Sequence, residues 1–98
     1  MASGTIPNPI GQFCVSVANV NASSGPETFT IPGDGNNYLL FTTNNNSDSV
    51  TMWFIRPNTS VAIKLIGGNN ITVTMGNSRS VTVTSAIRNV GVYLADIG

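Results

Sequence analysis

Eight short segments rich in Val, Ile, Thr and aromatic residues follow one another along this chain, and each is bounded by a cluster of Gly, Asn, Ser, Pro or Asp. In most of them apolar side chains occupy alternate positions, which is typical of a half-buried β-strand. No segment has a 3.6-residue apolar period long enough for a helix. The predicted strands cover residues 13–20, 27–31, 38–43, 50–55, 61–66, 71–75, 80–84 and 90–97.

The composition supports an all-β fold with an unusual surface. Val, Ile and Thr supply 30 of the 98 residues and Leu only four, and β-branched side chains favour the pleated strand. Hydrophobic residues make up 41% of the chain and charged residues 8%, which is too apolar for a disordered chain. The surface is therefore neutral and rich in amides and hydroxyls. A low net charge promotes self-association, so we expect a subunit of an oligomer, a virion or an extracellular surface.

A length of 98 residues points to one domain. Regular short strands separated by turns predict a compact antiparallel β-sandwich of about eight strands with jelly-roll or Greek-key connections. An immunoglobulin-like sandwich is the alternative, although the chain lacks the Cys–Trp–Cys arrangement of antibody domains. We expect residues 1–12 to form an extended N-terminal arm and residues 13–98 to form the sandwich.

Four segments support more detailed predictions. Residues 38–43 are apolar on both faces, which predicts a central strand. In residues 50–55 we expect the alternate set Val50, Met52 and Phe54 to face the core, so that Trp53 points to the outer surface. The turn sequences GGNN and GNSR are short enough for two hairpins.

The chain has few of the residue types that catalysis and metal binding require. The chain has no His and one Cys, so it cannot form a zinc cluster, a Ser-His-Asp triad or a Cys-His dyad. The acidic residues lie in four separate segments, at Glu27, Asp34, Asp48 and Asp96. We therefore predict that the protein is not an enzyme, with no catalytic residue, no metal site and no cofactor.

Nucleic acid and membrane partners are not expected either. Four scattered bases (Arg56, Lys64, Arg79 and Arg88) cannot form the positive stripe that a phosphate backbone requires. The longest apolar runs are far shorter than the roughly 20 residues of a membrane span. The first 20 residues lack the charged and apolar regions of a signal peptide.

The arm is a candidate contact with a partner subunit. Pro7 and Pro9 favour extended or polyproline II backbone. Ile6 and Ile10 flank them, and no local structure is predicted that could bury these two side chains. We expect the arm to dock on a partner subunit.

A polar loop and two aromatic residues are the other candidates. The loop presents amides and a carboxylate either to a sugar, to another protein or to solvent, through Asn44, Asn45, Asn46 and Asp48. Trp53 suits a subunit interface, a stacking platform for a sugar ring, or the core. Tyr38 is a similar candidate with less weight.

The Pro-containing arm GTIPNP, the Asn/Ser/Thr-rich strands and the final strand VGVYLADIG resemble the small β-sandwich modules of tailed-bacteriophage virions. These modules are the tips of head or tail fibres and capsid decoration proteins. The resemblance covers the whole chain in style and rests on no single motif. It implies a homotrimer on a virion, assembled in the host cytoplasm beside other virion proteins, and it transfers no functional residue.

We therefore expect one function and keep a second as its alternative. The first is a non-enzymatic virion structural protein, a bacteriophage capsid decoration or fibre and spike module that acts through oligomeric contacts, with host attachment as an additional role. The alternative is a lectin-like carbohydrate-binding module that holds a host-surface glycan through Trp53, Tyr38 and the loop at residues 44–48.

Overall fold

A computed structural model describes residues 14–31, 33 and 35–98. All eight predicted segments are strands, with ends that differ from the prediction by at most one residue. The described residues form β1 (Cys14–Val20), β2 (Glu27–Thr30), β3 (Tyr38–Thr43), β4 (Thr51–Arg56), β5 (Val61–Gly67), β6 (Ile71–Met75), β7 (Ser80–Ser85) and β8 (Val90–Asp96). Between these strands the described residues also form three single turns of 3-10 helix, η2 (Ser47–Ser49), η3 (Pro57–Thr59) and η4 (Asn77–Arg79).

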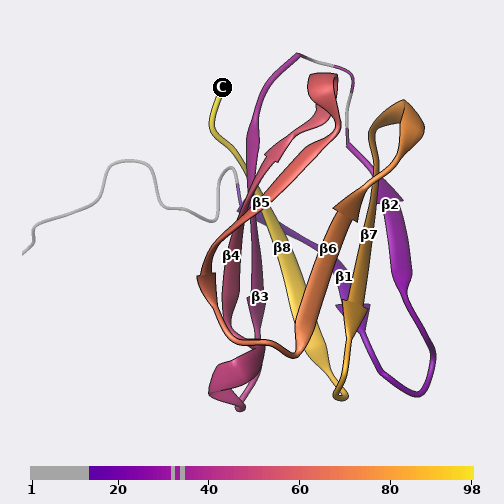
Figure 1. Cartoon of the computed structure of the whole chain (residues 1–98), viewed down its shortest axis with the longest axis vertical. Coiled ribbons are helices and arrows are strands. Elements are labelled where there is room, and N and C mark those ends of the chain that lie inside the picture. The colour runs from indigo at the N-terminus through magenta and orange to yellow at the C-terminus, as the bar shows by residue number, and fades with distance from the viewer. Residues whose placement is uncertain (1–13, 32, 34) are drawn as a thin grey trace, which may run out of the picture.

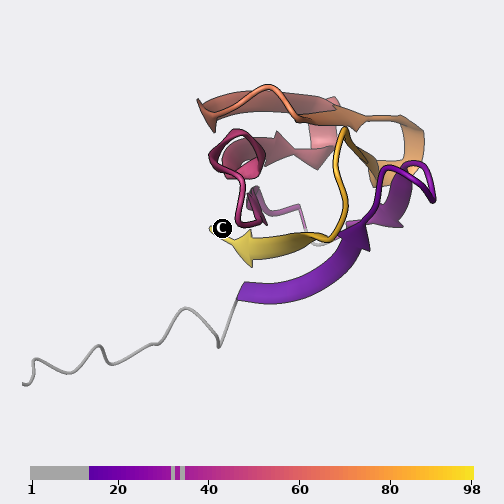
Figure 2. The ribbon, with the colours of Figure 1, turned by 90° about the horizontal axis from the view of Figure 1, so that it is seen from below.

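The strands form two antiparallel sheets that face each other (Figures 1 and 2). The larger sheet has the order β1-β8-β3-β4-β5, and the smaller sheet has the order β2-β7-β6. The predicted β-sandwich is therefore confirmed, and β3 is central in its sheet, as its two apolar faces predicted. No helix in the described part of the chain is long and apolar enough to cross a membrane.

The connections follow a Greek-key pattern. Strands β3, β4 and β5 are consecutive neighbours, and β8 returns by a long connection to lie beside β3. The chain passes between the two sheets on the way from β1 to β2, β2 to β3, β5 to β6 and β7 to β8. Each of these passages places the strand before it and the strand after it on opposite sides of one core.

One of the two predicted hairpins is present, and the prediction of the other is wrong. η4 joins β6 to β7, which pair with each other. β5 and β6 do not pair, and the turn between them carries the chain into the other sheet. A Cβ on Gly67, which has φ +125°, would lie 2.4 Å from the Val50 carbonyl oxygen, and one on Gly68 would lie 2.2 Å from the Asp48 Cα. These two glycines let the chain leave its sheet in close contact with the segment before β4.

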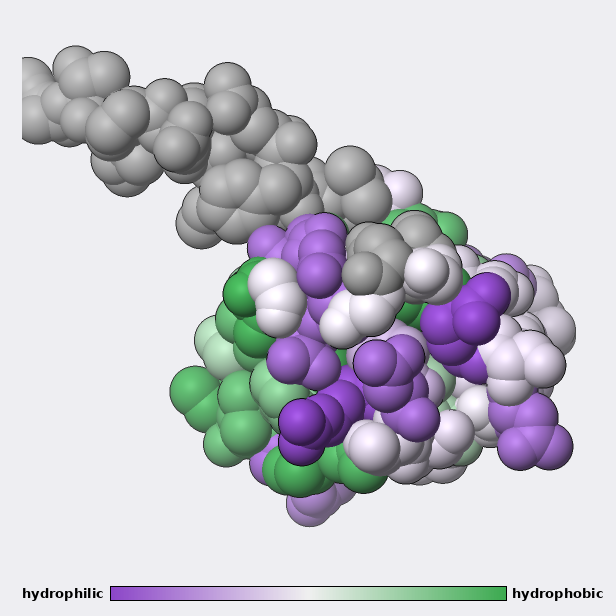
Figure 3. All heavy atoms as spheres, turned by 90° about the horizontal axis from the view of Figure 1, so that it is seen from above, coloured by the Kyte–Doolittle hydropathy of each residue, from purple (hydrophilic) through white to green (hydrophobic). Residues whose placement is uncertain are grey.

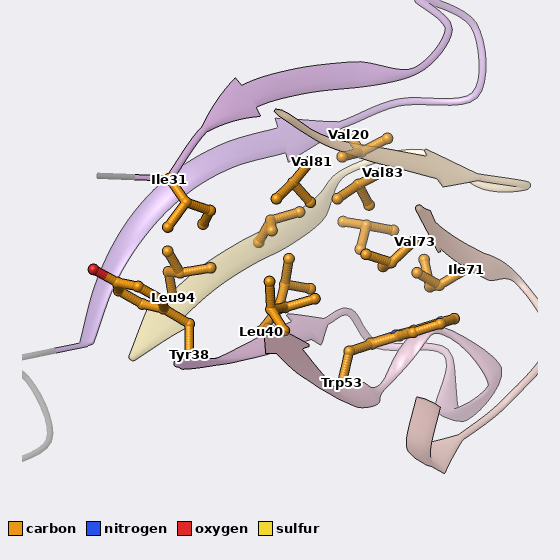
Figure 4. Close-up of a cluster of buried hydrophobic side chains, with 13 residues drawn as sticks. Val20, Ile31, Tyr38, Leu40, Trp53, Ile71, Val73, Val81, Val83 and Leu94 are labelled. Carbon is orange, nitrogen blue, oxygen red and sulfur yellow. The ribbon is translucent and has the colours of Figure 1, made fainter. Parts of the chain in front are cut away.

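The core lies between the sheets and consists mainly of β-branched side chains (Figure 4). In β6, β7 and β8 the alternate apolar residues are buried or nearly so, as their alternation with polar residues predicted. The residues of the buried core cluster are Val20, Ile31, Tyr38, Leu40, Trp53, Ile55, Ile71, Val73, Val81, Val83, Val90, Val92 and Leu94.

The predicted face of β4 is wrong. Trp53 is only 7% exposed and points into the core, while Met52 and Phe54 are half-buried on the opposite face (Figure 4). Both alternate sets of this strand contain large apolar side chains, so alternation alone could not orient it. Thr51 lies on the same face as Trp53 and is buried as well.

A chain of buried hydrogen bonds explains how a threonine can lie inside. The Trp53 indole N–H donates to Thr51 Oγ1 at 2.9 Å. Thr42 Oγ1 donates to the Ser49 carbonyl oxygen at 2.7 Å and is also hydrogen-bonded to Thr51 Oγ1. Because the Thr42 proton is used on Ser49, the Thr51 hydroxyl must donate to Thr42. Each donor in this series of hydrogen bonds therefore has an acceptor, which removes the free-energy cost of burying these polar groups.

Replacing Thr51 by the isosteric valine should lower the free energy of unfolding by about 1–3 kcal/mol, because the buried Trp53 N–H would lose its acceptor. Urea denaturation of both proteins measures this difference. Thr72→Val on the exposed face of β6 is the matched control and should change stability by less than about 0.5 kcal/mol. Equal effects of the two substitutions would contradict the hydrogen-bond chain.

Candidate functional site

The outer face of the five-stranded sheet is apolar. One row of cross-strand neighbours runs from Tyr93 through Phe41 and Met52 to Ile66. The next row runs from Ala95 through Leu39 and Phe54 to Ile63. We call Leu39, Phe41, Met52, Phe54 and Tyr93 the outer apolar face; all five are half-buried.

Among the described elements, none forms a third layer over this face (Figure 2). The side chains of the outer apolar face shield one another from solvent only in part. Figure 3 shows hydrophobic side chains gathered on the side of the molecule where Figure 1 places β4 and β5. A contiguous apolar surface that no other element covers usually marks an interaction site.

The edge strand β5 extends this surface. Ile63 and Leu65 are each 50% exposed and Ile66 is 64% exposed, and we call these three residues the β5 edge cluster. In the described part of the chain β5 pairs only with β4. Met52 pairs with Ile66 and Trp53 with Lys64, so a β-bulge leaves Leu65 as the extra residue.

The β5 edge cluster has little of the protection that free edges normally carry. Natural edge strands are shielded by charges, prolines or very short length. β5 is seven residues long and contains one charged residue, Lys64. The Lys64 ammonium donates to the Gly68 carbonyl oxygen at 2.7 Å and is thus engaged within its own chain. A long apolar edge with one engaged charge is suited to pairing with another chain.

A hollow of about 270 Å³ adjoins the β5 edge cluster. Ile66 forms one side of it, and Val50, which is 47% exposed, contributes another part of its wall. Its lining residues are Phe41, Thr42, Thr43, Val50, Thr51, Met52 and Ile66. The size and apolar lining suit one or two aliphatic side chains.

The two aromatic candidates of the sequence are not on this surface. Tyr38 and Trp53 are both buried and lie apart in the core (Figure 4). Tyr38 begins β3, whereas the polar loop follows the end of that strand, so Tyr38 and the loop lie at opposite ends of β3. The structure therefore does not bring these predicted site residues together, and neither ring is available to stack on a sugar.

The polar loop uses its amides to hold its own shape. The Asn44 amide donates to the carbonyl oxygens of Arg88 and Asn89 at 2.9 and 2.8 Å, and its oxygen accepts from the Asn46 N–H. The Asn46 oxygen in turn caps η2 by accepting from the Asp48 N–H at 2.9 Å. Asn45, Asn46, Ser47 and Asp48 are exposed. The loop is thus a structured turn with a polar surface toward solvent.

The remaining candidates, Ile6 and Ile10 of the arm, lie outside the described residues. Within residues 14–31, 33 and 35–98, no three Cys, Asp or Glu side chains are grouped as metal ligands would be.

Sequence reasoning missed the outer apolar face. Its signal was present, because residues 38–43 and 50–55 both carry large apolar side chains at odd and even positions. Two neighbouring strands of that kind have an apolar outer face whichever way they are oriented.

The outer face of the smaller sheet is different in character. It carries a hydroxyl row from Thr28 through Thr82 to Thr74, and Thr28 and Thr82 are hydrogen-bonded at 3.0 Å. Hydroxyl side chains are well hydrated and need no cover. The outer face of the smaller sheet is therefore rich in hydroxyl groups, whereas the outer face of the larger sheet is apolar.

No family model, no curated protein and no solved structure matches this chain. The surface chemistry described above is therefore the basis for a functional proposal.

Proposed function

We propose that this protein is a non-enzymatic structural subunit that assembles with copies of itself through the outer apolar face and the β5 edge cluster. The observation that carries the proposal is the set of three large aliphatic side chains, each at least half exposed, on an edge strand that pairs on one side only within the described residues. Surfaces of this kind are expected to be covered in the working state of a protein.

The energy of covering these side chains sets the size of the interface. Fully burying an Ile or Leu contributes about 1.5–3 kcal/mol, so three half-exposed side chains contribute about 2–5 kcal/mol. A micromolar complex needs about 8 kcal/mol. The β5 edge cluster is therefore too small alone, and we infer that the outer apolar face is covered as well.

The resemblance to bacteriophage sandwich modules supports a virion as the setting, either as a capsid decoration protein or as part of a fibre or spike. A subunit that is assembled permanently does not need the charged surface of an isolated protein, which agrees with a charged fraction of 8%. We propose a homotrimer that contacts other virion proteins. The lectin-like alternative loses its support, because Trp53 and Tyr38 are buried.

Sedimentation of the purified protein tests self-association. We expect a mass of about 31 kDa, three times the 10.2 kDa of one chain, because the resemblance to bacteriophage sandwich modules implies a homotrimer. The triple variant Ile63→Ser, Leu65→Ser, Ile66→Ser should dissociate at concentrations where the unaltered protein remains assembled.

Ile97→Ser is the matched control, because Ile97 is 47% exposed but lies outside the β5 edge cluster. It should sediment like the unaltered protein. A protein that is monomeric at every concentration, or a triple variant that assembles normally, would refute the proposal.

A further inference from the structure

The prolines of the N-terminal arm have a spacing that selects one edge of an extended strand. In a β-strand the N–H groups of alternate residues point to the same edge, so Pro7 and Pro9 remove two donors from one edge. Ile6, Asn8 and Ile10 keep their N–H groups on the other edge. Ile6 and Ile10 also share one face, because they are four residues apart. This segment is therefore suited to pair with a single strand, while its second edge is closed by proline.

β5 is the free edge that best matches such a segment. It is long, its exposed side chains are aliphatic, and the apolar hollow lies beside Ile66. The other edge strands offer less: the exposed residues of β1 include Ser16 and Asn19, β2 has only four residues, and the exposed residues of β6 include Thr72 and Thr74. When an extended peptide adds to a sheet edge, main-chain hydrogen bonds give affinity and pockets for alternate side chains give specificity.

The arm cannot place both Ile6 and Ile10 along β5 of its own chain. Cys14 lies in one cross-strand row with Ala95, Leu39, Phe54 and Ile63, so four strand spacings, about 19 Å, separate Cys14 from β5 across the sheet. A strand added beyond β5 would lie about 5 Å further.

Ile10 is four residues from Cys14, and four extended residues span at most about 14 Å. Ile10 therefore cannot lie along β5 of its own chain. A second copy must supply the edge that this segment pairs with.

We propose that the segment around Ile6 and Ile10 of one copy adds as a strand to the free edge of β5 in a neighbouring copy. There the two isoleucines cover the β5 edge cluster and one of them enters the hollow beside Ile66. Each copy donates one arm and receives one. This is a heterologous contact, which generates a closed ring when the rotation between copies permits. The inference rests on the proposed function, and names its partner and mode of contact.

A mixing experiment with two full-length variants tests the arm contact. The arm variant Ile6→Ser, Ile10→Ser keeps an intact β5, and the edge variant Ile63→Lys, Leu65→Lys keeps an intact arm. Each variant alone should sediment as a monomer. An equimolar mixture should form a heterodimer of about 20 kDa and nothing larger, since only one arm and one edge are intact.

Two results would overturn the arm contact. If the arm variant alone assembles like the unaltered protein, the edge is covered without the arm, for example by β5 of a second copy. If the mixture gives no heterodimer although both variants have the circular dichroism of the unaltered protein, arm and edge do not meet.

A peptide titration keeps the test decisive if the edge variant does not fold. The probe is a synthetic peptide of residues 4–13, GTIPNPIGQF, added to the arm variant and followed by calorimetry. We expect binding of one peptide per chain, and at least about tenfold weaker binding when both isoleucines of the peptide are replaced by serine. Absence of binding by the unaltered peptide would refute the arm contact. If the unaltered protein is nevertheless oligomeric, self-assembly stands and only the arm contact falls; if it is monomeric, both fall.

Discussion

Trp53→Ala is expected to lower the free energy of unfolding by about 3–5 kcal/mol, the usual cost of removing a large aromatic side chain from a core. Trp53 is 7% exposed and contacts the core cluster between the two sheets. Its replacement leaves a cavity and also leaves Thr51 without the indole donor. A chain of this length has a total stability of about 5–15 kcal/mol, so the variant should be largely unfolded at moderate temperature.

Phe54→Ala on the next residue of the same strand is the matched control. Phe54 is half-buried on the outer apolar face, so its loss should cost the monomer about 1–2 kcal/mol and should weaken assembly. Urea denaturation of the two variants measures the difference. In the unaltered protein the single tryptophan should emit at short wavelength at every dilution, because it is buried within its own chain. Equal destabilisation by the two substitutions, or red-shifted emission on dilution, would contradict the orientation of β4.

Gly68→Ala has the second largest expected effect. A Cβ at this position would lie 2.2 Å from the Asp48 Cα and 2.6 Å from the Asp48 carbonyl oxygen, and these backbone atoms cannot rotate away. The Asp48 carbonyl also accepts the Asn70 N–H at 3.1 Å, and the Asn70 carbonyl accepts from Ala86 at 2.8 Å. Displacing this segment should cost about 1–3 kcal/mol or more, in the range of overpacked sites.

Gly76→Ala is the control for Gly68→Ala. A Cβ on Gly76 would meet only ordinary contacts, the nearest at 3.8 Å from Ser80 Cβ, and its φ of −105° suits any residue. We expect its melting temperature to change little or to rise slightly, because alanine restricts the unfolded chain. Gly68→Ala should melt well below both proteins. A Gly68→Ala protein as stable as Gly76→Ala would mean that the passage from β5 to β6 is not tightly packed.

The outer apolar face shows why part of the candidate site could be predicted and part could not. The segments that form it were recognisable as strands with apolar side chains on both faces. Their partner strands were not, because the rows from Tyr93 to Ile66 and from Ala95 to Ile63 join residues from four separate segments. The exposure of the β5 edge cluster depends on which strand ends the sheet, and that order is a property of the whole fold.

The orientation of β4 is a second case. Val50, Met52 and Phe54 form the more apolar alternate set, and hydrophobicity alone places that set inside. The structure buries Thr51, Trp53 and Ile55 instead. The decisive groups are Thr42, which accepts from the Thr51 hydroxyl, and the Ser49 carbonyl, which accepts from Thr42; together they make a polar side chain acceptable in the core.

The sequence by itself determined that the chain is all-β, because strand and turn propensities act over a few neighbouring residues: β-branched side chains favour extended backbone, and Gly, Asn and Pro end each strand. Its periodicity also determined the inward faces of β6, β7 and β8, where one alternate set is apolar and the other polar. Only the tertiary structure decided that the turn after β5 crosses between sheets, that Trp53 lies inside and that β5 is a free edge. These features depend on contacts between segments far apart in the chain, whose free energies no local pattern records.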